Sequence, residues 1–173
     1  LSRLKLILNK RRFKSKINSD IVIKIVKDIK KNKQKALLKY EKKFSKNTKI
    51  RPTKKEINKS IKSLDPKIKN AIDFAYSRIL KFHSLQKNKN IKYVDKQNNK
   101  IEYRYIPIQS VGIYVPSNLP STLLMNAILA KKIAGVKRVV LANPRLNGKL
   151  NPAVMYAAKK CGISEIISVG GSQ

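Results

Sequence analysis

Between residues 109 and 173, short apolar segments alternate with helix signals, and this alternation limits the possible folds more than any other feature of the chain. The apolar segments occupy residues 111–115, 136–142 and 163–169. Between them, Pro120-Ser121-Thr122 and Asn151-Pro152 are typical helix starts. The order strand, helix, strand, helix, strand predicts a parallel α/β unit, because parallel neighbours need a crossover connection and that crossover is usually a helix.

The first hundred residues carry a different pattern. Helical periodicity predicts helices over residues 20–31 and 34–44, a third from the capping box at Thr53 to about residue 64, and a fourth from Asp65-Pro66 to about residue 85. The side chains expected to face inward are those of Ala36, Leu37, Tyr40 and Phe44 in the second helix and of Ile68, Ile72, Ile79 and Phe82 in the fourth. Residues 91–95 and 101–106 then flank a polar turn, which predicts a β-hairpin.

The net charge of the chain is +32, from 41 basic and 9 acidic residues. Such a balance favours contact with nucleic acid or another anionic surface. Lysine supplies 33 of the basic residues and arginine only 8, although arginine is the usual residue for bidentate reading of base edges. Aromatic side chains fall mostly on apolar stripes. We therefore expect the charge to face water, with no specific nucleic-acid partner.

The chain contains one histidine, His83, and one cysteine, Cys161. These two residues cannot complete a tetrahedral zinc site, which takes three or four protein ligands, so any zinc ligands must lie elsewhere. No apolar run approaches the roughly 20 residues of a membrane span, and no signal peptide opens the chain. We expect a cytoplasmic protein without a membrane partner. The first residue is leucine and the last residues form a glycine turn, which indicates a fragment.

A parallel sheet binds ligands beyond the carboxyl ends of its strands. Three loops qualify, namely 116–121, 143–150 and 170–173, and Gly170-Gly171 would let backbone approach a ligand closely. No G-x-G-x-x-G fingerprint follows the first strand. Tyr114 ends that strand, where it can be either a ligand contact or a packing aromatic.

The two remaining reactive residues have structural alternatives. His83 has a pKa suited to proton transfer, but no acid nearby in sequence would orient it, so we expect a structural role at a helix edge. Cys161 follows an alanine-rich helix and is expected to be a buried packing residue.

Several long motifs are similar to those of one known family. They are Ser110-Val111-Gly112-Ile113-Tyr114-Val115-Pro116, Pro120-Ser121-Thr122-Leu123-Leu124-Met125-Asn126-Ala127-Ile128, Asn151-Pro152-Ala153-Val154 and Val169-Gly170-Gly171-Ser172-Gln173. Through them the chain resembles the histidinol dehydrogenases. Ala36-Leu37 with Tyr40 and Phe44, and Phe82-His83 with Gln86, fit the helical N-terminal part of that family, so the resemblance covers nearly the whole chain.

The resemblance implies the N-terminal portion of a zinc- and NAD-dependent oxidoreductase of histidine biosynthesis. Such enzymes oxidise L-histidinol to L-histidine through histidinal with two NAD⁺ in sequence, and they are homodimers with Rossmann-like domains. Residues 1–108 would then form a helical segment with a β-hairpin, and residues 109–173 the first part of a Rossmann-like α/β domain. By position, Tyr114 and Gln173 match the tyrosine and glutamine that contact NAD.

In the family, the zinc ligands, the catalytic glutamate and histidine, and the substrate contacts lie downstream of this sequence. The resemblance therefore implies no catalytic and no metal-binding residue in this chain, which alone is expected to be inactive. Two departures stand out: the loop 116–121 is about three residues shorter than usual, and Leu129 replaces a common proline, which should straighten its helix. A non-catalytic paralogue and a basic nucleic-acid-binding module remain as alternatives.

Overall fold

The computed structural model describes residues 2–116 and 118–171, with side chains from residue 20 onward. The chain begins with α1 (Ser2–Ser45), which is two helices joined at Lys33. The backbone of Lys33 has φ 46° and ψ −125°, outside the helical region. The break expected between residues 31 and 34 is therefore confirmed, while the first helix extends back to Ser2.

Helices α2 (Lys54–Lys62) and α3 (Pro66–Ser84) begin at the predicted caps. The Thr53 hydroxyl accepts the Glu56 N–H at 3.2 Å, and Glu56 Oε2 accepts the Thr53 N–H at 2.7 Å. The side chain of Asp65 accepts the Lys67 N–H at 2.7 Å. These side chains satisfy backbone donors that have no partner in the first helical turn.

Three side chains that were expected to face inward are exposed, so that part of the prediction is wrong. They are Phe44 at the end of α1, and Ile68 and Phe82 near the two ends of α3. Ile72 is buried, because the middle of α3 packs on the helices of the α/β unit. Periodicity identifies the apolar face of a helix, but the neighbouring elements decide how much of that face is covered.

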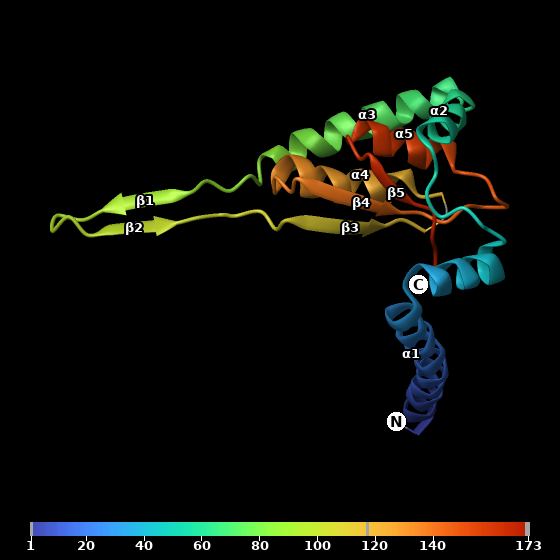
Figure 1. Ribbon diagram of the computed structural model, residues 1–173. Helices are drawn as coiled ribbons and strands as arrows, with labels where there is room; N and C mark the ends of the chain where they lie inside the picture. The colour runs from blue at the N-terminus through green and yellow to red at the C-terminus, as the bar shows by residue number, and fades with distance from the viewer. Residues whose placement is uncertain (1, 117, 172–173) are drawn as a thin grey trace.

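The predicted β-hairpin is confirmed. Strands β1 (Ile91–Val94) and β2 (Lys100–Tyr103) pair antiparallel, with Ile91 opposite Tyr103. The second strand ends three residues earlier than expected. Every residue of both strands is exposed, and the hairpin extends away from the body of the molecule (Figure 1).

The predicted parallel α/β unit is also confirmed. Strands β3 (Ser110–Tyr114), β4 (Arg138–Ala142) and β5 (Glu165–Ile167) form a parallel sheet in that order. Helices α4 (Pro120–Ile128) and α5 (Pro152–Lys160) make the two crossovers.

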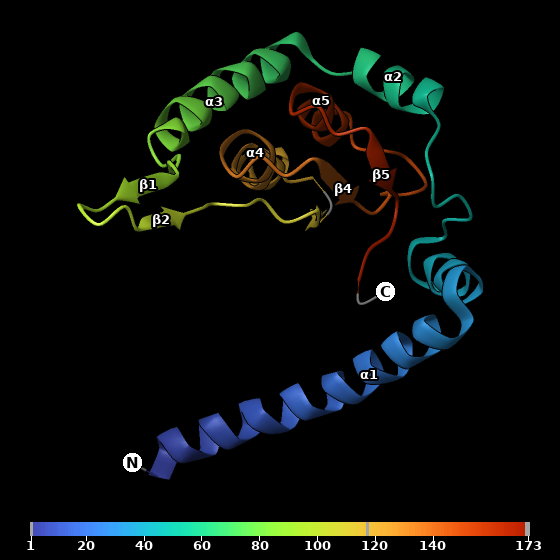
Figure 2. The same cartoon turned by 60° about the vertical axis from the view of Figure 1, so that its left-hand side comes forward.

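The core lies between one face of this sheet and its helices. α4 and α5 pack on the sheet, and α2 and α3 pack over them (Figure 2). Apolar side chains of the strands, of α4 and α5 and of α3 form a single cluster; among its members are Ile72, Ile113, Val115, Leu123, Leu141, Val154 and Ile166. The other face of the sheet carries Tyr114, Val140 and Ile167, which are half-buried or exposed.

The helix after α4 differs from the expectation. Instead of straightening at Leu129, it widens into a π-helical turn, η1 (Leu129–Ile133). The Ala134 N–H donates to the Leu129 carbonyl at 2.8 Å, five residues back. Leucine has the backbone N–H that proline lacks, but the helix does not continue as a regular α-helix here. It forms a wider turn instead, and Gly135, with φ 73°, ends it.

Candidate functional site

One buried residue, Asn143, links the carboxyl ends of the three parallel strands. Its backbone N–H donates to the Ile167 carbonyl at 2.9 Å, and its side-chain amide donates to the Val115 carbonyl at 2.8 Å. Asn143 is fully buried. Sequence reasoning placed the loop 143–150 at this edge but missed Asn143; the available signal was a polar residue directly after a buried strand.

Tyr114 lies at this edge as the last residue of β3, in register with Ala142. Its side chain is 49% exposed, so it does not belong to the packed core. It is also one of the residues that line a cavity of about 920 Å³ beside β3, although most of the others come from segments that precede β3 or β4 (86–90, 105–108 and 129–136). A half-exposed tyrosine offers a ring face for stacking and a hydroxyl for hydrogen bonding to a ligand.

The loop after β5 approaches the loop after β4 closely. A Cβ atom on Gly170 would lie 2.7 Å from Cβ of Pro144, a separation that real side chains do not tolerate. Gly171 has φ 70°, in the left-handed region that favours glycine. Both positions therefore favour glycine: position 170 has no room for a side chain, and position 171 has a positive φ. Gln173, the second expected cofactor contact, lies outside the described residues.

The N-terminal segment also reaches this edge, which the sequence analysis did not foresee. The Gly170 N–H donates to Oε1 of Glu41 at 2.9 Å, and the side-chain amide of Asn47 donates to the Ser168 carbonyl at 3.0 Å. The Ser168 N–H donates to the Ile50 carbonyl at 2.6 Å. Glu41 and Asn47 are both buried. The only signal in the sequence was an acid between Tyr40 and Phe44 on a helix expected to pack.

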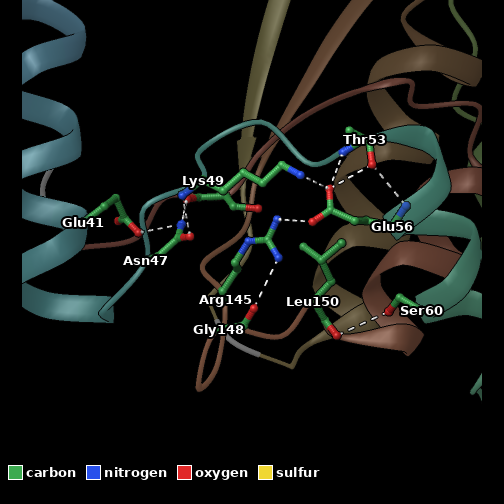
Figure 3. Close-up of polar contacts among 10 residues, drawn as sticks. Glu41, Asn47, Lys49, Thr53, Glu56, Ser60, Arg145, Gly148 and Leu150 are labelled. Carbon is green, nitrogen blue, oxygen red and sulfur yellow. Dashed lines mark hydrogen bonds and ion pairs between the residues drawn. The ribbon is translucent and has the colours of Figure 1, made fainter.

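An ionic cluster fixes the loop after β4 to α2 (Figure 3). The Arg145 guanidinium lies 3.5 Å from Glu56 Oε1 and donates to the Gly148 carbonyl at 3.2 Å, while Lys49 Nζ lies 3.0 Å from Glu56 Oε2. The backbone N–H of Thr53 and the Lys49 ammonium lower the pKa of Glu56 to about 2. A second cavity, of about 640 Å³, lies between residues 44–46 and 144–148.

His83 and Cys161 lie away from the carboxyl edge. Nδ1 of His83 is 2.6 Å from Oε1 of Gln86, at the end of α3 that leads into the hairpin. Cys161 is buried, and burial raises the pKa of its thiol to about 11, so the thiolate is disfavoured. Both observations support the structural roles expected for these residues.

Within residues 2–116 and 118–171, no group of three or more histidine, cysteine, aspartate or glutamate side chains could hold a metal ion. The described side chains therefore do not fit a zinc centre. In the same part of the chain, no helix is both long enough and apolar enough to cross a membrane.

Comparison with known proteins identifies similar sequences and similar solved structures. A family model described as histidinol dehydrogenase matches residues 8–173. Histidinol dehydrogenase of Pelagibacter ubique is 61% identical over 168 residues, which are 95% of this chain and 39% of that protein. The Campylobacter jejuni (strain RM1221) enzyme is 40% identical over 159 residues, covering 89% of this chain and 36% of its own length.

A crystal structure of histidinol dehydrogenase from Elizabethkingia anophelis superposes with a TM-score of 0.82 at 37% identity. The match covers 90% of this chain and 37% of that one. The chain thus spans about two fifths of the length of the relatives that it matches.

Proposed function

The chain belongs to the histidinol dehydrogenase family, and on this premise we propose that it supplies the cofactor-side part of an enzyme that oxidises L-histidinol to L-histidine through histidinal, with NAD⁺ as oxidant. The observation that carries the proposal is Tyr114, half-exposed at the carboxyl end of β3. Ligands of open α/β sheets bind at this edge. Asn143 and the 168–171 loop frame the same edge.

The position and exposure of Tyr114 fit a dinucleotide contact. The exposed ring at the carboxyl end of β3 can stack on a flat heterocycle. When bound, NAD⁺ supplies the hydride acceptor. Tyr114 binds and orients the cofactor, Gln173 adds amide donors and acceptors two residues beyond Gly171, and the buried Asn143 keeps the strand ends in register.

The remaining parts of the proposal concern groups outside this chain. In this proposal the zinc ligands and the catalytic acid and base belong to the downstream part of the enzyme, as the resemblance to the family implies. The whole enzyme is a cytoplasmic homodimer in this proposal. What this chain contributes is the framework and one wall of the cofactor site.

The test is oxidation of L-histidinol by the full-length protein loaded with zinc. NADH formation is followed by absorbance, and the ratio of NADH to L-histidine is measured at completion. We expect turnover with two NADH per L-histidine. A folded, zinc-loaded protein that reduces no NAD⁺ would support the non-catalytic paralogue and overturn the proposal.

A further inference from the structure

We propose that Glu41 is a positioning residue for the cofactor, because its carboxylate holds the backbone of the loop that follows β5. The inference rests on the proposed function, which places the cofactor at the carboxyl edge that this loop frames. It gives the N-terminal helix α1 a role in cofactor binding. Neither the charge of α1 nor its position in the sequence, far from residues 168–171, suggests this role.

The first step is where the loop finds its hydrogen bonds. Up to Ile167, the backbone of β5 pairs with β4, and the last bond of that ladder runs from the Asn143 N–H to the Ile167 carbonyl. Beyond Ile167, the buried backbone of this loop is hydrogen-bonded to the N-terminal segment instead. The Gly170 N–H donates to Glu41, the Ser168 N–H donates to the Ile50 carbonyl, and the Asn47 amide donates to the Ser168 carbonyl. The N-terminal segment therefore sets the path of the loop where the sheet stops doing so.

The second step is that the loop is held from two sides. The Glu41 carboxylate binds the Gly170 N–H on one side, and Pro144 contacts Gly170 on the other, so closely that no Cβ would fit. Gly171 then turns the chain with φ 70°. A shift of Gly170 would therefore move the 168–171 loop, which frames the carboxyl edge where the proposed function places the cofactor.

The third step is the choice of a carboxylate at a fully buried position. Burying an acidic side chain is unfavourable unless hydrogen bonds compensate for the lost water. An apolar side chain of similar size would pack there without that penalty but would leave the Gly170 N–H without its acceptor, which costs more than the bond itself contributes. Glu41 is thus better explained by the backbone that it holds than by packing.

The experiment uses two variants of the full-length zinc-loaded enzyme. Glu41→Gln retains a carbonyl acceptor at the same reach, whereas Glu41→Leu has a similar volume and no acceptor. We expect Glu41→Leu to raise the KM for NAD⁺ roughly tenfold, with kcat at saturating NAD⁺ and the KM for L-histidinol within about twofold. Glu41→Gln should restore most of the NAD⁺ affinity. Amide hydrogen exchange of a peptide spanning residues 166–171 should accelerate in Glu41→Leu.

Asp73→Asn is the matched control. Asp73 accepts the Tyr156 hydroxyl and pairs with Lys160, which links α3 to α5 away from this loop. We expect this variant to lower the melting temperature without changing the KM for NAD⁺. If Glu41→Leu does not fold, Asn47→Ala removes the hydrogen bonds from the Asn47 amide to the Ser168 carbonyl and to Oε2 of Glu41, and it should raise the KM for NAD⁺ in the same direction.

The outcomes separate the two proposals. An unchanged KM for NAD⁺ in Glu41→Leu, an equal rise in Glu41→Gln, or an equal rise in Asp73→Asn would each overturn the role of Glu41. If instead Tyr114→Ala and Gln173→Ala leave the KM for NAD⁺ unchanged, the cofactor lies elsewhere and the proposed function fails together with this inference.

Discussion

Tyr114 is the described residue whose substitution tests the proposed cofactor site most directly. Because its ring is half-exposed, Tyr114→Ala should change the melting temperature little, in contrast to the ~3–5 kcal/mol lost when a core aromatic is truncated. The KM for NAD⁺ should rise roughly tenfold to a hundredfold, equivalent to about 1–3 kcal/mol of lost contacts. Tyr114→Phe separates the ring from the hydroxyl. Zinc content, measured by metal analysis, should stay the same.

A collapsed melting temperature with an unchanged KM for NAD⁺ would contradict this expectation, since it would make Tyr114 a packing residue. Steady-state kinetics and a thermal melt on the same preparation of full-length enzyme distinguish the two results.

Lys33 carries backbone strain that a single substitution should relieve. Its φ of 46° and ψ of −125° lie in a region that glycine adopts readily and lysine does not. We expect Lys33→Gly to stabilise the protein by about 1 kcal/mol, measured by denaturant unfolding. Lys31→Gly, two residues earlier in regular helix, should instead destabilise it by about 1 kcal/mol. Equal destabilisation by both would show that the break at Lys33 is absent in solution.

Single residues show both how far sequence reasoning reaches and where it stops. The burial of Cys161 and the position of Tyr114 at a strand end follow from local patterns. The roles of Glu41 and Asn143 do not, because each depends on a partner that is distant in sequence: Glu41 on Gly170, and Asn143 on Val115 and Ile167.

At the scale of elements, α2 offers a test by pH. The pKa of Glu56 is lowered to about 2 in the folded protein, below its ordinary value of 4.5. The stabilisation that Glu56 provides is therefore fully present above about pH 4.5 and is lost as the pH falls towards 2. Glu56→Gln keeps a capping side chain but removes the charge that faces Lys49 and Arg145.

We therefore expect the stability of Glu56→Gln to fall less steeply than that of the wild type between pH 4.5 and 2. Thermal melts at intervals across this range measure the slope, and far-UV circular dichroism at neutral pH checks that the helix is retained. Parallel pH profiles for the two proteins would show that Glu56 titrates at its ordinary pKa.

Elements with local signals were predictable, and those set by tertiary contacts were not. The capped starts of α2 and α3, the hairpin and the three parallel strands each follow from residues that are adjacent in sequence. The π-helical turn at Leu129 and the exposure of Phe82 do not, because they depend on how α3, α4 and the sheet are placed against one another.

For the molecule as a whole, the layering is one-sided. The described helices that pack on the parallel sheet, α4 and α5, lie on one face (Figure 2), whereas parallel sheets are ordinarily covered on both. Tyr114, Val140 and Ile167 lie on the uncovered face, and the hairpin projects apolar side chains such as Ile91 and Tyr103 into solvent. The candidate cofactor site therefore has one wall in this chain.

The last prediction is that the 173-residue chain alone does not oxidise L-histidinol, with or without added zinc. The chain has one histidine and one cysteine, and its described residues contain no cluster that could hold a metal. A structural or catalytic zinc site requires three or four protein ligands from histidine, cysteine, aspartate or glutamate side chains. Purified chain mixed with NAD⁺, L-histidinol and zinc should produce NADH only at the rate of a protein-free control, and it should retain no zinc after gel filtration. Zinc-dependent NADH formation above that rate would mean that the chain itself contains the catalytic centre.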